Sequence, residues 1–81
     1  MNLIVLTPEK EIYNGPIRSV KVPAIGGQFE ILNKHAPIVA ALEKGNIRVI
    51  DTKEQKTNFS IENGYIEVLH DEVVILVTVL P

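Results

Sequence analysis

The chain has 81 residues, of which 46% are hydrophobic, enough for one folded domain and too many for a disordered segment. Eight basic and ten acidic residues give a net charge of −2, which argues against a nucleic-acid-binding patch. The absence of cysteine excludes disulfides and thiolate metal sites. No apolar run approaches the roughly 20 residues of a membrane-spanning helix, and the first residues lack the basic start and apolar length of a signal peptide.

The first part of the sequence predicts short strands separated by turn residues. The second strand should end in a turn at Asn14-Gly15-Pro16. In the third, Val20 and Val22 should face the core and Ser19 the solvent. Pro23 should end that strand. The expected strands are Asn2–Thr7, Glu11–Tyr13, Ser19–Val22 and Gln28–Leu32.

The second part of the sequence continues in the same way. Pro37 could open a helix of under two turns at Ala36–Leu42, but we expect a strand there. The charged segment Asp51–Lys56 should be a hairpin tip. Asn63-Gly64 predicts a second hairpin, because type I′ turns need positive φ at both central residues. The remaining strands are expected at Asn46–Val49, Asn58–Glu62, Tyr65–Leu69 and Glu72–Leu80.

The last predicted strand, Glu72–Leu80, is apolar at both odd and even positions. An antiparallel strand with one wet face would alternate, so this strand should be covered on both sides. It is either a central strand near a contact surface or an edge strand that docks a partner. Many short strands with regularly spaced turns favour a β-sandwich over any α/β fold.

The sequence offers little for catalysis. A hydrolytic triad needs a nucleophile, a base and an orienting acid, and His35 and His70 are the only histidines. They are far apart in sequence, and no carboxylate has metal-ligand spacing to either. We expect the serines to be solvated, and we predict no catalytic residue, cofactor or metal ligand. The hydroxyl side chains considered are Thr7, Ser19, Thr52, Thr57, Ser60 and Thr78.

Two short motifs have a structural and a functional interpretation. Gly26-Gly27 lacks the lysine and following helix of a phosphate loop, so we expect a turn that requires positive φ or a close approach of the backbone. His35, which precedes Ala36-Pro37, either fixes its own loop through hydrogen bonds to the backbone or contacts a partner at a protein interface.

The ordered set of motifs resembles a known family. In this order and spacing, and over essentially the full chain, they are similar to the amino-terminal domain of the epsilon subunit of F-type ATP synthase. The motifs are Thr7-Pro8-Glu9-Lys10-Glu11, Asn14-Gly15, Val20-Lys21-Val22-Pro23, the segment from Gly26 to Leu32, His35-Ala36-Pro37, Leu42-Glu43-Lys44-Gly45, Ile47-Arg48, the segment from Gly64 to Val68, and the apolar strand from Val73.

The resemblance implies a ten-stranded β-sandwich of two antiparallel sheets, with residues 1–81 as a single domain. It further implies a non-catalytic rotor subunit of the central stalk, which couples proton or sodium transport to ATP synthesis. The implied partners are the gamma subunit and the ring of c subunits, with membrane contact only through the complex. The implied location is the cytoplasmic face of the inner (plasma) membrane.

The sequence departs from the family's pattern at two places. Asn33-Lys34 stands where the family commonly has Pro-Gly, a turn that can still form because Asn tolerates left-handed φ. Most relatives continue into a helical hairpin, whereas this sequence stops at Pro81, so we expect neither the hairpin's inhibition of ATP hydrolysis nor its ATP site.

The resemblance also assigns contact residues by motif. The implied gamma-subunit contacts are Thr7, His35 and Ala40, and the implied c-ring contact loop is Gln28, Phe29 and Glu30.

Two other classes of function remain open at this stage. A small ligand-binding β-sandwich module, for example for a carbohydrate, would use exposed aromatic platforms. The chain has no Trp, and its aromatic residues are Tyr13, Phe29, Phe59 and Tyr65. A metal-dependent enzyme would have to use His35 and His70. An exposed docking face could also pair with its own copy in isolation, which we would regard as a concentration effect.

Overall fold

A computed structural model describes residues 1–79. These residues form seven strands and no helix, which confirms the predicted all-β class. The strands are β1 (Asn2–Leu6), β2 (Glu11–Ala24), β3 (Gly27–Leu32), β4 (Ile38–Leu42), β5 (Gly45–Asp51), β6 (Lys56–Leu69) and β7 (Glu72–Val79). The last two residues of the sequence, including Leu80 of the predicted final strand, lie outside the described part.

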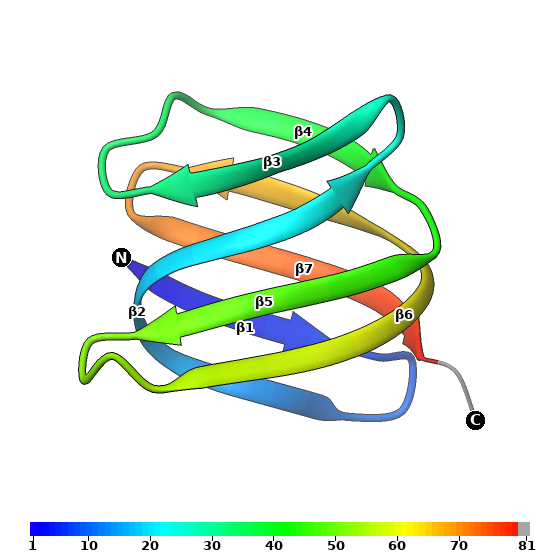
Figure 1. The fold of residues 1–81 in the computed structure, drawn as a ribbon, viewed down its shortest axis with the longest axis horizontal. Helices are drawn as coiled ribbons and strands as arrows, with labels where there is room; N and C mark the ends of the chain where they lie inside the picture. The colour runs from blue at the N-terminus through cyan, green and yellow to red at the C-terminus, as the bar shows by residue number, and fades with distance from the viewer. Residues whose placement is uncertain (80–81) are drawn as a thin grey trace.

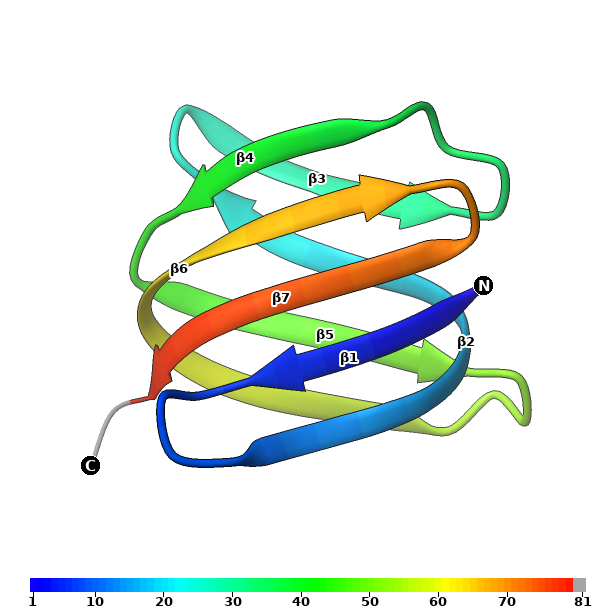
Figure 2. The same ribbon diagram turned by 180° about the vertical axis from the view of Figure 1, so that it is seen from behind.

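The strands form two stacked layers around one core (Figure 1). The first layer contains β4, the second half of β6, β7 and β1, and it faces the viewer in Figure 2. The second layer contains β3, the second half of β2, β5 and the first half of β6. All pairs are antiparallel except β1 and β7, which run parallel. Seven continuous strands approximate the expected ten because β2 and β6, with 14 residues each, serve both layers.

Each long strand contains a β-bulge. In β6 the pairing register with β7 shifts between Ile61 and Asn63. The extra residue changes which side chains face inward, so that Ile61 is buried before the bulge and Ile66 after it. In β2 the register with β5 shifts in the same way after Ile17. A bulge bends its strand and increases the twist, which lets one strand continue from layer to layer.

The predicted hairpin turn at Asn63-Gly64 is wrong, because β6 runs through both residues without a break. Neither residue has positive φ, which a type I′ turn would require. Gly64 is needed for a different reason. A Cβ atom there would lie 2.3 Å from the Leu76 carbonyl oxygen of β7, so only glycine lets the two backbones approach.

Two expectations for β2 are also wrong. The predicted turn at Asn14-Gly15-Pro16 is extended strand that pairs with β1, and Pro23 continues the strand by pairing with Gln28. Ser19, expected to be solvated, is only 2% exposed. It lies next to the bulge, with Leu32 and Ile50 as cross-strand neighbours.

The core lies between the layers and is formed almost entirely by aliphatic side chains. Alternation along each strand supplies them, as predicted for Val20 and Val22. β4 is a strand, as expected. The buried hydrophobic cluster comprises Leu3, Val5, Ile17, Val20, Val22, Ala24, Ile31, Leu42, Ile47, Val49, Ile61, Ile66, Val68, Val73, Ile75 and Val77.

Candidate functional site: an apolar sheet face

The outward side of the first layer is unusually apolar. Strand pairing aligns Val39, Glu67, Val74 and Ile4 in one row across the sheet. In the next outward row, strand pairing aligns Ala41, Tyr65, Leu76 and Leu6. The outward apolar side chains of this sheet, which we call the apolar face, are Ile4, Leu6, Val39, Ala41, Tyr65, Leu69, Val74 and Leu76.

Several of these side chains are more exposed than apolar groups of a sheet usually are. Val39 is 70% exposed, Tyr65 61% and Leu76 51%. β7 is a central strand between β1 and β6, so its second apolar side reflects this exposed face and not an edge. Of the two alternatives left open by the sequence, the structure supports a central strand, but the outward side of this strand is exposed and not covered as predicted. Exposed apolar side chains gathered on one sheet face are typical of an interaction surface.

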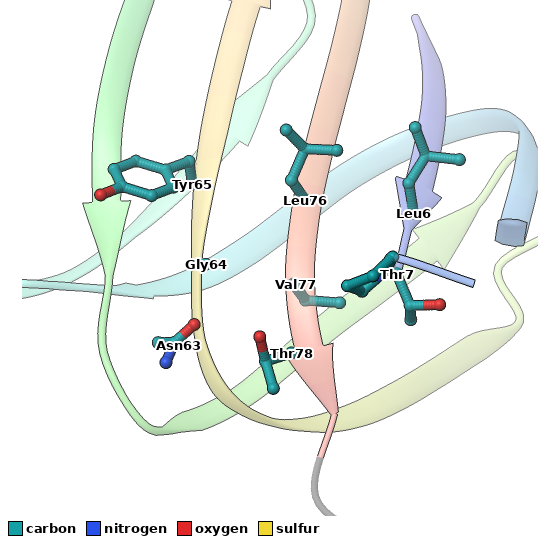
Figure 3. Close-up of a pocket in the computed structure, with 9 residues that line it drawn as sticks. Leu6, Thr7, Asn63, Gly64, Tyr65, Leu76, Val77 and Thr78 are labelled. Carbon is teal, nitrogen blue, oxygen red and sulfur yellow. The ribbon is translucent and has the colours of Figure 1, made fainter. Parts of the chain in front are cut away.

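A shallow hollow of about 310 Å³ lies at one end of the apolar face. Figure 3 shows Tyr65, Leu76 and Leu6 side by side on β6, β7 and β1, with Gly64 next to Tyr65 on β6. Thr7 borders the hollow. Its hydroxyl accepts a hydrogen bond from the Lys10 amide (3.1 Å) and so fixes the turn between β1 and β2.

His35 lies at the opposite end of the molecule, in the loop between β3 and β4. Its ring Nδ1 lies 2.7 Å from the Ala36 carbonyl oxygen, so it donates the hydrogen bond there. Its ring stacks on Phe29, with centroids 6.5 Å apart. The half-buried histidine therefore stabilises its own loop through a hydrogen bond to the backbone, which is one of the two interpretations of His35. The residue with left-handed φ in this turn is Lys34 (65°) and not Asn33.

Ala40 lies in β4 but points toward the core, where it is partly buried against the hydrophobic cluster. Its neighbours Val39 and Ala41 face outward in its place. The signal that could have separated these positions is the two-residue alternation of β4. That alternation is not visible in the sequence, because the segment from Ile38 to Leu42 is apolar throughout.

The residues expected to form the ring-contact loop lie at the start of β3. Gln28 is exposed, whereas Phe29 is half-buried against the core. Glu30 is exposed and forms an ion pair with Arg48 of β5 (2.9 Å). Gly26 and Gly27 have φ of 95° and 146°, which confirms a glycine-dependent turn between β2 and β3.

Ile25, which was not among the residues predicted to form a contact, stands at the tip of this turn and is 66% exposed. An aliphatic side chain immediately before a glycine pair is the sequence signal that could have identified it. Ile25 and Gln28 are thus the two prominent side chains at the tip of the β2–β3 hairpin, one apolar and one polar.

The outward side of the second layer, which we call the polar face, has the opposite character. Lys21 pairs in register with Glu30 on one side and with Arg48 on the other. The side chain of Asn46 donates a hydrogen bond to that of Asn58 (2.8 Å). Charges of both signs therefore meet on this face, as expected for a surface in water.

Within residues 1–79, no group of three or more His, Cys, Asp or Glu side chains could hold a metal ion. The tip of the β6–β7 hairpin does bring His70 beside His35, and the two line one polar hollow.

Burial, with a smaller contribution from the Asp51 carboxylate, raises the pKa of Tyr13. No helix of this part of the chain is long and apolar enough to cross a membrane.

Fold and surface together define a small β-sandwich module with one exposed apolar sheet face. A sequence model of the ATP synthase delta/epsilon chain β-sandwich domain matches residues 1–80. The chain therefore belongs to the family of ATP synthase delta/epsilon chain β-sandwich domains.

Similar proteins from other organisms are consistent with this assignment. The chain is 40% identical over 74 residues to an ATP synthase epsilon chain of Protochlamydia amoebophila, covering 91% of this chain and 50% of that protein. It is 35% identical over 74 residues to the epsilon chain of Chlorobium limicola, covering 91% and 84%. It is 37% identical over 76 residues to the epsilon chain of Helicobacter pylori, covering 94% and 61%. The chain thus spans from half to most of the length of these relatives.

Solved structures confirm the fold. A chain of the Euglena gracilis mitochondrial ATP synthase, in a structure of OSCP, F1 and the c-ring, superposes with a TM-score of 0.87 at 21% identity, covering 93% of this chain and 48% of that chain. A chain of the Tetrahymena thermophila mitochondrial ATP synthase, in a structure of central stalk and c-ring, gives 0.80 at 19% identity, covering 95% and 62%.

Proposed function

We propose that this chain is a non-catalytic rotor subunit of the central stalk of an F-type ATP synthase. It joins the gamma subunit to the c-ring and so couples proton or sodium transport to ATP synthesis. The observation that carries the proposal is the exposed apolar face on a domain whose family is that of the epsilon chain. The complex would hold it at the cytoplasmic face of the inner (plasma) membrane, without membrane contact of its own.

The apolar face is the surface proposed to dock the gamma subunit. Thr7 borders it at one end, and His35 holds the loop that leads into β4 at the other. Ala40 supports it from beneath. Burying its exposed aliphatic and aromatic side chains would contribute roughly 25 cal/mol for each Å² removed from water. That contribution favours a lasting contact, which a rotor component requires.

The tip of the β2–β3 hairpin is the surface proposed to contact the c-ring. Gln28 is exposed there, and Glu30 projects from the same strand on the polar side. Phe29 anchors the strand by packing against the core and the His35 ring. A short turn anchored in this way can transmit force with little deformation, because close-packed interiors have low compressibility.

Torque coupling places few chemical demands on such a domain. It requires a stiff body with two separate contact surfaces, and the long strands β2 and β6 continue through both layers. A ligand-binding module is not favoured. Of the aromatic side chains only Tyr65 is an exposed large hydrophobic group, whereas Phe29 and Phe59 pack partly against the core.

Calorimetric titration of the chain into the gamma subunit of the same ATP synthase tests the proposal. The native chain should bind with one-to-one stoichiometry. Leu76→Gln, which places an amide on the apolar face, should weaken binding at least about tenfold, since one buried aliphatic side chain contributes about 1.5–3 kcal/mol. His35→Ala should also weaken it, through the loop that His35 fixes.

Two variants serve as controls in the same titration. Ser60→Gln introduces the same amide on the polar face, where Ser60 is exposed opposite Asn46. Gln28→Ala alters the hairpin tip. Both should bind gamma like the native chain, and Gln28→Ala should weaken only the contact with the c-ring. A folded native chain that does not bind gamma at micromolar concentration would refute the proposed function.

A further inference from the structure

The apolar face carries two carboxylates and no cation. Glu67 lies in the middle of the face, directly between Val39 on β4 and Val74 on β7. It lines a hollow together with Val39, Tyr65, Val74 and Leu76. Glu72 lies one row further toward the β6–β7 hairpin, between Leu69 and Asn2. In the rows of the sheet that contain Glu67 and Glu72, no outward position on β4, β6, β7 or β1 carries a lysine or an arginine.

Outside the apolar face, two glutamates form ion pairs with arginines. The ion pairs formed by residues 1–79 are Arg48 with Glu30, on the polar face, and Arg18 with Glu54, near the β5–β6 tip. Within this described part, neither Glu67 nor Glu72 forms an ion pair or a side-chain hydrogen bond. Both side chains are exposed and therefore hydrated in the isolated domain.

Docking would change that hydration. A partner that covers Val39, Tyr65 and Leu76 also covers Glu67, because this carboxylate lies among them in the same hollow. A carboxylate that is removed from water without a compensating partner opposes association strongly. A surface that covers the apolar face tightly must therefore place a compensating group over Glu67, and a cationic group also neutralises its charge.

We propose that Glu67 is a specificity-determining contact of the apolar face, and that it forms a desolvated ion pair with a lysine or arginine of an otherwise apolar partner surface. This inference rests on the proposed function, in which the partner is the gamma subunit. It adds the chemistry that the facing surface must have: aliphatic groups around one basic side chain. Glu72 favours a basic partner surface further but lies nearer the hairpin end.

The same arrangement argues against a second copy of this chain as the occupant. A two-fold contact between two apolar faces would bring the Glu67 and Glu72 carboxylates of both copies onto one interface. Like charges across an interface cost several kcal/mol and so select against the wrong partner. Glu67 thus acts in two ways, by attracting a basic partner and by preventing self-association.

Titration of charge variants into the gamma subunit tests this inference. Glu67→Gln keeps the size of the side chain and removes its charge, and it should weaken binding at least about tenfold. Its binding should also depend less on salt than that of the native chain. Glu54→Gln removes one negative charge near the β5–β6 tip and should bind gamma within about twofold of the native chain. Thermal unfolding should show that Glu67→Gln is as stable as the native domain, since Glu67 is exposed.

The outcomes separate the two proposals. If the native chain binds gamma and Glu67→Gln binds with less than a tenfold loss, the ion pair is refuted while the rotor function stands. If Glu67→Gln and Glu54→Gln weaken binding equally, net charge and not the position of Glu67 is responsible, and the inference is again refuted. If the native chain dimerises at micromolar concentration at neutral pH and does not bind gamma, both proposals fail.

Discussion

Replacing Gly64 with alanine should destabilise the domain by about 2–3 kcal/mol, although the substitution adds a single methyl group. The added Cβ would lie 2.3 Å from the Leu76 carbonyl oxygen and 3.0 Å from Val77 Cγ1. The first of these atoms belongs to the backbone, so no side-chain rotation can relieve the contact. β7 would have to withdraw from β6 at the bulge, where the two strands register Gly64 with Val77.

The size of the effect is set by two opposing terms. Overpacking of a well-packed site costs typically about 1–3 kcal/mol, and displaced backbone lies at the upper end. A Gly→Ala change lowers the entropy of the unfolded chain, which offsets about 0.4–1 kcal/mol. The net loss is a large fraction of the roughly 4–12 kcal/mol expected for a domain of this length.

Gly15→Ala is the matched control. Gly15 also lies inside a long strand, but its nearest atoms to an added Cβ are those of the Tyr13 side chain, at 4.0 Å. The variant should be neutral or slightly more stable than the native domain. Urea denaturation followed by circular dichroism measures both variants. A loss below about 1 kcal/mol for Gly64→Ala, or equal losses for both, would refute the close-approach argument.

Two further predictions concern the core and the pH response. Ile47→Ala should cost about 2–5 kcal/mol in urea denaturation because Ile47 is fully buried, whereas Val39→Ala on the exposed apolar face should change stability by under about 0.5 kcal/mol; similar losses would contradict the assigned core. Tyr13 has its pKa raised above 10.0 by burial and by Asp51, so the folded state keeps the phenol proton longer than the unfolded state. The contribution of Tyr13 to the free energy of unfolding should therefore be fully present below its unfolded-state pKa and be lost as pH rises through its folded-state pKa. Tyr13→Phe should lessen this loss in unfolding titrations, and an unchanged pH profile would contradict the argument.

The sequence predicted the strands that have one wet and one dry side. Val20 and Val22 alternate with polar residues, and this two-residue period is a local property that needs no partner strand to be recognised. The charged tip after β5 and the glycine turn before β3 were recognisable for the same reason. Ordered motifs along the whole chain further indicated the family, which the match over residues 1–80 confirms.

The errors occurred where one local pattern is compatible with two tertiary environments. Asn63-Gly64 is favourable in a hairpin turn, but it also suits a strand that must pass close to another backbone. Asn14-Gly15-Pro16 is favourable in a turn, but pairing with β1 holds it extended. The contacts that decide between these possibilities come from segments distant in sequence, and no window of neighbouring residues contains them.

The all-β class, the alternating strands and the family of the domain could be predicted from the sequence, because periodicity and motif order are properties of the linear chain. The bulges, the burial of Ser19 and the composition of the apolar face depend instead on contacts between distant strands. Val39, Glu67 and Val74 belong to three different strands, and cross-strand register alone makes them neighbours. A docking surface on a sheet arises from that register, so it exists only once the strands have paired.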